Sequence, residues 1–335
     1  MFAIFSYAFN AVSPILILVV IGYLLRENKV FEPDFFKKLN RFAFHYCFPP
    51  LMFTNLYKLG SIREIDLRLA GYLMVSILTI TAVSILLANL VTKVRNRKGV
   101  LIQAGFRSNF AVIGLPLVEG LCGAEGASIA AAMQAPTVIY FNLAAVLFLA
   151  MYSDDAEFDF GKVMKNVASN PMIQGLGLGL AALVIREFIP VSADGTLIFS
   201  ISGTTPWLYT VLNYLGRLGT PLCLIAMGGQ FSFGDIGTVQ KELTWGVCMR
   251  LLLAPAIGFG MAFAARSLGL LAMTPTAVGI MVAAYGSPIA TSSAVMAAEM
   301  KGDDVLAGQI VVWSCFFSIF TVFLLTVGFR YAGLL

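Results

Sequence analysis

Two stretches of this 335-residue chain place helix-breaking residues inside apolar runs. The first covers residues 105–123, where Asn109, Gly114 and Pro116 interrupt a segment long enough to cross a membrane. Proline has no backbone N–H and clashes with the carbonyl group four residues earlier. Lipid offers freed backbone groups no partner, so we expect this break to line a cavity.

The second stretch, over residues 285–304, repeats the plan of the first. Ser287-Pro288 is followed by Gly302 at the spacing that separates Ser108-Asn109 from Gly123. Two broken spans in corresponding halves of a chain are typical of the binding site of a transporter.

The residues around these breaks suit an anion. Asn109 offers two donors and an acceptor, either to a ligand or to the neighbouring helix. We expect Pro116 and Pro288 each to open a half-helix, whose N-terminal N–H groups and partial positive charge attract anions. A simple proline kink is the alternative. The hydroxyl groups of Ser287, Thr291 and Ser292 would join the site, unless they bond the carbonyls of their own helix.

Arg107 stands close to Asn109, and a buried arginine at membrane depth costs several kcal/mol unless it is paired or hydrated. We take Arg107 as the first candidate for binding a substrate carboxylate, and a cytosol-facing anchor as the alternative. Arg217 and Arg250 also stand in predicted spans, and we take them as weaker candidates for the same role.

Three further residues are candidates for binding a coupling ion. Glu119 and Glu299 stand toward opposite ends of the broken helices, where a carboxylate binds a cation or proton or simply reaches water. His45 is the single histidine, and it would serve proton coupling or a helix-to-helix hydrogen bond.

The composition indicates a polytopic membrane protein. Hydrophobic residues make up 59% of the chain and charged residues 12%, with a mean hydropathy of +0.87. Roughly ten spans fit this length. The five cysteines include no CxxC pair, and the chain has no HExxH or GxSxG motif, so we expect neither a metal nor an active site.

The spans and their orientation follow from hydropathy and charge. Lysine and arginine gather in the first and third loops, which places both termini outside the membrane. Apolar windows predict spans near residues 10–26, 40–57, 69–92, 101–121, 127–151, 171–186, 206–230, 243–266, 275–298 and 305–330.

The two halves resemble each other weakly. Ser13-Pro14 matches Asn170-Pro171, and Pro50-Leu51 matches Pro221-Leu222, in the same order. We therefore expect an all-α polytopic fold, in which ten transmembrane helices form two inverted five-helix repeats and helices 4 and 9 are broken and cross. The first repeat is expected over 1–151, a cytosolic linker loop over 152–169 and the second repeat over 170–335.

The chain also resembles a known family, the auxin efflux carriers, which include plant PIN-type carriers and bacterial malonate and malate permeases. The resemblance covers essentially the whole chain. It rests on Asn109-x4-Gly114-Leu115-Pro116, on Cys47-x-Pro49-Pro50-Leu51 and on the stretch around Pro288.

The resemblance implies the fold of the bile-acid symporters, with spans 1, 2, 6 and 7 as a scaffold and spans 3–5 and 8–10 as a transport domain. Asn109, Pro116 and Pro288 map onto the crossing of spans 4 and 9, and Pro50 maps onto the scaffold face of the substrate pocket. Arg107 departs from the plant pattern, which has a small residue there, and this favours a small carboxylate.

The sequence thus predicts a secondary active or facilitative carrier of an organic anion, such as malonate, malate or an auxin-like compound. It would work in the cytoplasmic membrane by elevator-type alternating access. A sodium-coupled symporter of a larger organic anion is the alternative, and an integral-membrane lipid enzyme a weaker one. We expect no cofactor beyond a coupling Na⁺ or H⁺, and no nucleic-acid partner. Assembly as a homodimer in the lipid bilayer is a further expectation.

Overall fold

The structure is a computed structural model that describes residues 2–58, 66–153, 161, 165, 168–190, 198–231 and 236–335. Throughout these residues every regular element is a helix. The longer elements are α1 (Phe2–Glu27), α2 (Pro33–Phe42), α3 (Phe48–Tyr57), α4 (Leu67–Val91), α5 (Arg95–Phe106), α6 (Leu115–Met151), α8 (Pro171–Arg186), α10 (Pro206–Gln230), α11 (Ile236–Cys248), α12 (Ala254–Ser267), α13 (Pro275–Gly286), α14 (Ser292–Glu299) and α15 (Asp304–Tyr331), and a short α9 (Ile201–Thr204) precedes α10.

Among the described residues, three π-helical turns each run directly into the α-helix that follows them. They are η1 (Ala43–Cys47), η3 (Phe110–Gly114) and η4 (Met249–Leu253), and two of them, η1 and η4, also continue the helix before them. Each is followed by a proline in the first two positions of the next α-helix. Because proline cannot donate to the carbonyl four residues earlier and clashes with it, a widened turn accommodates it without breaking the rod. The chain therefore crosses these prolines as a continuous helix.

Among the described residues, four helical segments are long and apolar enough to cross a membrane, judged by length and composition. They are Leu67–Val91, Glu125–Met151, Ile236–Ser267 and Asp304–Tyr331. Two shorter apolar helices are α8 and α13. The described part of the chain is therefore all-helical with several membrane-length helices. Most of the expected linker at 152–169 lies outside the described residues.

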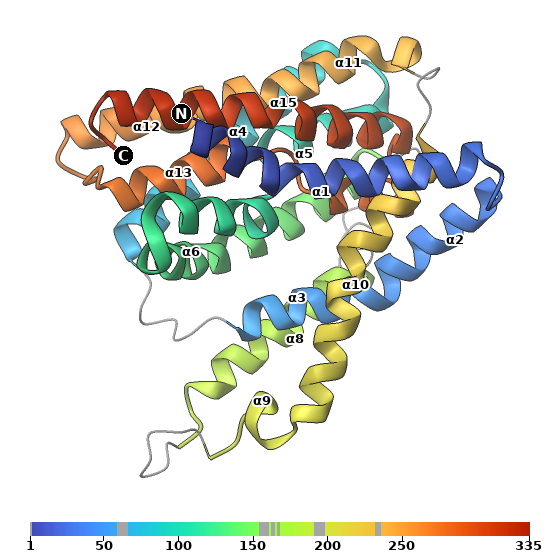
Figure 1. The fold of residues 1–335 in the computed structure, drawn as a ribbon, viewed down its shortest axis with the longest axis horizontal. Coiled ribbons are helices and arrows are strands. Elements are labelled where there is room, and N and C mark those ends of the chain that lie inside the picture. The colour runs from blue at the N-terminus through green and yellow to red at the C-terminus, as the bar shows by residue number, and fades with distance from the viewer. Residues whose placement is uncertain are drawn as a thin grey trace.

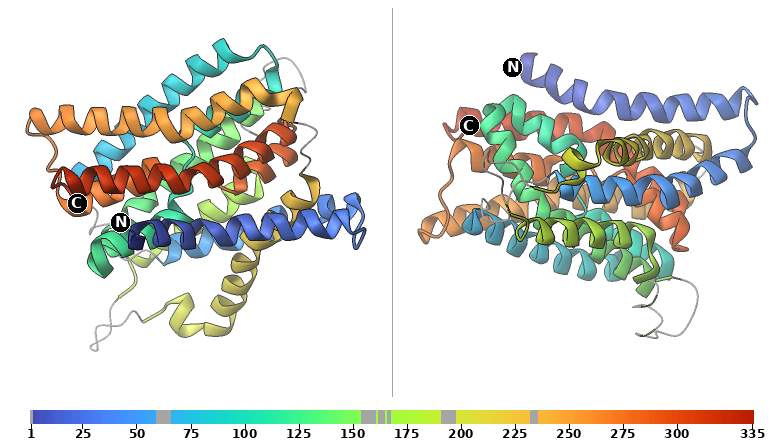
Figure 2. Two further views of the ribbon diagram at one scale, coloured as in Figure 1. Left: turned by 45° about the horizontal axis from the view of Figure 1, so that its top comes forward. Right: turned by 90° about the horizontal axis from the view of Figure 1, so that it is seen from below.

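The helices form two packed groups. Helices α4, α5, α6, α12, α13 and α15 run side by side, while α3, α8 and α10 form a second group that projects from the first (Figures 1 and 2). Helix α1 packs on both α10 and α15. Glycine allows this close packing: a Cβ atom at Gly228 would lie 1.9 Å from the carbonyl oxygen of Val19.

Both stretches that the sequence marked as broken are broken. Helix α5 ends at Phe106 and helical backbone resumes at Phe110, while α13 ends at Gly286 and α14 begins at Ser292. The expectation that Pro116 opens the first half-helix was wrong. Pro116 lies in the first turn of α6, after η3 has already begun at Phe110, because the π-helical turn absorbs the proline.

Candidate functional site

The two breaks meet and pair through their backbones. Ser108 and Ile289 form an antiparallel bridge. The backbone N–H of Asn109 donates to the carbonyl of Pro288 at 2.8 Å, and that of Ala290 donates to the carbonyl of Arg107 at 3.0 Å. Non-helical backbone at membrane depth needs partners inside the protein, and each break provides them for the other. We call this pairing the crossover.

Arg250 holds the helix ends that lead into the crossover. Its guanidinium, 1% exposed, donates to the carbonyls of Gly105 (3.1 Å), Ala284 (2.9 Å), Tyr285 (2.7 Å) and Ser287 (3.0 Å). These carbonyls lie at the C-terminal ends of α5 and α13, which carry partial negative charge and lack intrahelical partners. One side chain from η4 therefore caps both half-helices.

Arg107, the residue that directly follows α5, is 2% exposed, so it does not reach water as an anchor would. It donates to Asn142 Oδ1 (2.9 Å) and Ser292 Oγ (2.9 Å), and also to Ser293 Oγ (3.2 Å) and Gln103 Oε1 (3.4 Å). All four acceptors are neutral. No carboxylate of the described residues forms an ion pair with Arg107.

Several polar atoms at the crossover are buried without a hydrogen-bond partner. They include Asn109 Nδ2 and the hydroxyl oxygens of Ser108 and Ser287. A buried polar group without a partner costs roughly 1–3 kcal/mol, so such groups are normally satisfied by water or a ligand. The crossover thus presents unused hydrogen-bonding groups.

A cavity of about 60 Å³ adjoins these groups. Arg107, Ser108, Asn109 and Ser292 line it from the crossover side. Leu51, Met52 and Asn55 of α3 and Thr220 of α10 line the facing wall, and Phe48, Val138, Phe141, Asn142, Ala290 and Thr291 complete it. One water requires about 10–15 Å³ by this measure, so the cavity matches a few water molecules or a ligand of a few heavy atoms.

The sequence-predicted site residues separate into two sets. Asn109, Arg107, Thr291 and Ser292 line the cavity. Pro288 contributes its carbonyl to the crossover, and Ser287 lies buried beside it. Pro50 is not among the lining residues, although Leu51, which follows it, is, and the side chain of Pro116 lies outside the described part of the structure.

The three candidates for a coupling ion do not line this cavity. Glu119 is exposed and Glu299, the last residue of α14, is half-buried. His45 Nδ1 lies 3.0 Å from the carbonyl of Arg41, one turn earlier in the same rod. Among the described residues, no three His, Cys, Asp or Glu side chains gather where they could hold a metal ion.

Sequence reasoning missed several residues of the site. Asn142 and Gln103 hold Arg107, and Asn55 and Thr220 line the facing wall. Asn142 stands in a long apolar segment, and Gln103 is one helical turn before Arg107. An amide side chain in these apolar surroundings is the sequence signal that could have identified both residues as partners of Arg107.

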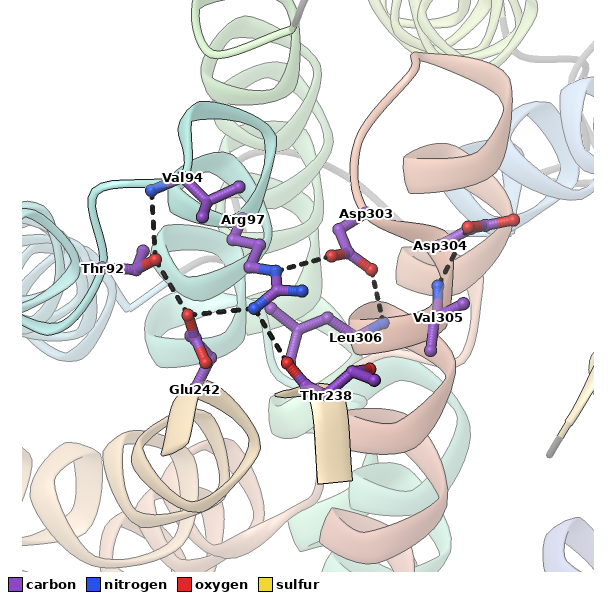
Figure 3. Close-up of polar contacts among 9 residues, drawn as sticks. All are labelled: Thr92, Val94, Arg97, Thr238, Glu242, Asp303, Asp304, Val305 and Leu306. Carbon is purple, nitrogen blue, oxygen red and sulfur yellow. Dashed lines mark hydrogen bonds and ion pairs between the residues drawn. The ribbon is translucent and has the colours of Figure 1, made fainter. Parts of the chain in front are cut away.

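A second polar cluster, separate from the crossover, consists of Thr92, Arg97, Glu242 and Asp303 (Figure 3). Arg97 of α5 donates to Asp303 Oδ2 at 2.8 Å and to Glu242 Oε1 of α11 at 3.2 Å. Thr92 also donates to Glu242, and Asp303 caps the N-terminus of α15 by accepting from the N–H of Leu306. The cluster ties together α5, α11 and α15.

Comparison with known proteins relates the chain to membrane transporters. A family model described as membrane transport protein matches residues 7–174 and 160–326. An uncharacterized transporter of Methanothermobacter thermautotrophicus is 23% identical over 318 residues, 94% of this chain and 96% of the relative. Another, of Methanocaldococcus jannaschii, is 23% identical over 261 residues, 75% of this chain and 77% of the relative. The chain therefore belongs to the membrane transport protein family, whose members are the auxin efflux carrier-like transporters.

Proposed function

We propose that this transporter moves a small organic anion, a carboxylate of the size of malonate or malate, and binds it at the crossover. The observation that carries the proposal is the cavity beside Arg107, Ser108 and Asn109, where a buried cation adjoins polar atoms without partners. A carboxylate would accept from Asn109 Nδ2 and the Ser108 hydroxyl.

Charge supports an anion over a neutral substrate. Arg107 is buried among neutral acceptors, and a buried charge without a counter-charge is strongly unfavourable. A bound carboxylate would supply that counter-charge. The helical segments that begin at Phe110 and Ser292 start beside the cavity, and each adds roughly 0.3–1 kcal/mol for a negative charge.

For the mechanism, we propose ten membrane spans in two inverted five-helix repeats, over 1–151 and 170–335, with 152–169 as a linker loop. Spans 1, 2, 6 and 7 would form the scaffold, and spans 3–5 and 8–10 the transport domain. The separate packing of α3, α8 and α10 supports this division. An elevator-type displacement of the crossover past α3 and α10 would then expose the cavity alternately to each side.

We further propose a location in the cytoplasmic (plasma) membrane with both termini outside, on the basis of the loop charges. Assembly as a homodimer and coupling to Na⁺ or H⁺ remain part of the proposal. Glu119, Glu299 and His45 are its coupling residues, and they would act away from the cavity, which none of them lines.

Ligand-induced thermal stabilisation of the purified protein tests the substrate class. A ligand that binds the folded state raises its apparent stability by mass action. Malonate and malate should raise the melting temperature, whereas malonamide, the neutral analogue of malonate, should not. Repeating the series with and without sodium tests the coupling ion. Equal shifts with malonate and malonamide would contradict an anion site.

A further inference from the structure

A second cavity lies at the end of the scaffold next to α9. Its volume is about 690 Å³. Its described lining residues include two cations, Lys58 and Arg186, and three hydroxyl residues, Ser200, Ser202 and Thr204, and none of these described residues is a carboxylate. This composition suits a negatively charged ligand.

Two helices connect this α9 cavity to the crossover cavity. Helices α3 and α10 pack against each other in opposite directions: Gly216 lies against Leu51, and Tyr209 lies against Tyr57 with ring centroids 5.7 Å apart. Tyr57 and Tyr209 both line the α9 cavity. The C-terminal end of α3 and the N-terminal end of α10 therefore both lead from the crossover cavity to the α9 cavity.

On each helix, a cation stands one turn from a residue that lines the crossover cavity, and Arg217 lies next to Gly216, which packs against Leu51. On α3, Asn55 lines the crossover cavity and Lys58 comes three residues later. On α10, Thr220 lines it and Arg217 comes three residues earlier. Residues three apart share a helix face, so both cations lie on the faces that continue from the crossover cavity.

The charge of Arg217 reaches Lys58, and no described carboxylate forms an ion pair with either residue. Partial burial of the Lys58 ammonium group, and after it the positive charge of Arg217, lowers the pKa of Lys58. Both side chains are exposed, and neither takes part in an ion pair within the described ranges. Like charges held together without a counter-ion create a positive potential that attracts anions.

We propose that Lys58 and Arg217 form an entry site that attracts a small carboxylate from the α9 cavity and passes it to the crossover cavity. This inference rests on the proposed function, because it assumes an anionic substrate. The site would set the concentration at which transport saturates, while the crossover would set the rate of the conformational step.

The test is uptake of radiolabelled malonate into proteoliposomes made of zwitterionic lipid. The variant is Lys58→Gln with Arg217→Gln, which removes two charges and keeps side-chain length. Its KM should rise about tenfold at low ionic strength while the maximal rate stays unchanged. The KM of the wild type should rise with added salt, and that of the variant should respond much less, because salt screens exposed charges.

The matched control is Arg266→Gln with Arg330→Gln, which removes two exposed cations from the last turns of α12 and α15. Its KM should equal that of the wild type. A similar rise in KM in both double variants would assign the effect to overall surface charge and overturn the entry site. An unchanged KM in Lys58→Gln with Arg217→Gln would also overturn it, as would a lower maximal rate with an unchanged KM.

The lipid composition of the vesicles distinguishes binding of the carboxylate from binding of a lipid phosphate, because both groups are anions with similar chemistry. The KM effect should be present in vesicles of purely zwitterionic lipid. An effect confined to vesicles that contain anionic phospholipid would show that the cations bind lipid and would overturn the inference. Absence of malonate uptake by the wild type would overturn the proposed substrate class as well, whereas the other outcomes leave that class intact.

Discussion

The N–H of Asn109 donates to the carbonyl of Pro288, at 2.8 Å, and this bond joins the two broken helices. The missing N–H of proline does not weaken the pairing, because the crossover uses the carbonyl of Pro288 and the N–H of Ala290. The side chain of Asn109 remains unpartnered at Nδ2 and adjoins the cavity. Backbone pairing therefore fixes the position at which the proposed site presents its donors.

Arg107→Gln should weaken carboxylate binding far more than it weakens the fold. Loss of a buried charge partner costs about 2 kcal/mol or more, which is roughly thirtyfold in Kd. Arg107→Lys keeps the charge and should recover part of the affinity. Titration calorimetry with malonate and the melting temperature of each variant measure the two effects. Parallel loss of binding and folded protein in both variants would make Arg107 purely structural.

Arg250→Gln should destabilise the fold itself. The substitution leaves several of the four carbonyls that Arg250 caps without a donor, at about 1–3 kcal/mol for each unsatisfied group. We expect a large fall in melting temperature and in abundance in the membrane. Arg217→Gln removes an exposed arginine and serves as the control. Equal melting temperatures for the two variants would contradict the capping role.

Arg97→Gln should loosen the contact between α5, α11 and α15. Its ion pairs with Glu242 and Asp303 are partly exposed, so the loss in stability should be roughly 1 kcal/mol or less. A double-mutant cycle of Arg97→Gln with Asp303→Asn measures the coupling. Additive effects of the two substitutions would mean that the pair contributes nothing to stability.

Gly228→Ala should separate α1 from α10, because its Cβ atom would lie 1.9 Å from the carbonyl oxygen of Val19. Forced overpacking of this kind costs typically 1–3 kcal/mol. Gly177→Ala in α8 is the matched control, since nothing lies within 4 Å of its Cβ position. It should be neutral or stabilising by up to about 1 kcal/mol. The melting temperatures of both variants decide the matter, and equal values would contradict the close packing.

Both breaks, and polar residues that line one cavity, could be predicted from the sequence. Asn109 and Ser287-Pro288 interrupt long apolar runs, and the need to satisfy freed backbone groups makes their meeting a physical expectation. The position of the first break could not be predicted. A proline indicates a break, but a π-helical turn before Pro116 accommodated it instead.

The role of Arg250 could not be predicted from the sequence either. Its four acceptors are backbone carbonyls on α5 and α13, and backbone groups leave no signature in residue types. Asn142 and Gln103 are different, because their side chains hold Arg107 and both stand in apolar surroundings. Side-chain partners of a buried charge leave a sequence signal, whereas backbone partners do not.

We propose that a carboxylate binds at Asn109, and calorimetric titration of malonate into Asn109→Ala checks this. Asn213→Ala is the control, because the Asn213 amide donates to Tyr209 of its own helix and does not line the cavity. We predict measurable malonate binding by the wild type and by Asn213→Ala, and at least about tenfold weaker binding by Asn109→Ala at an unchanged melting temperature. Equal malonate affinity in all three proteins would contradict a carboxylate site at the crossover.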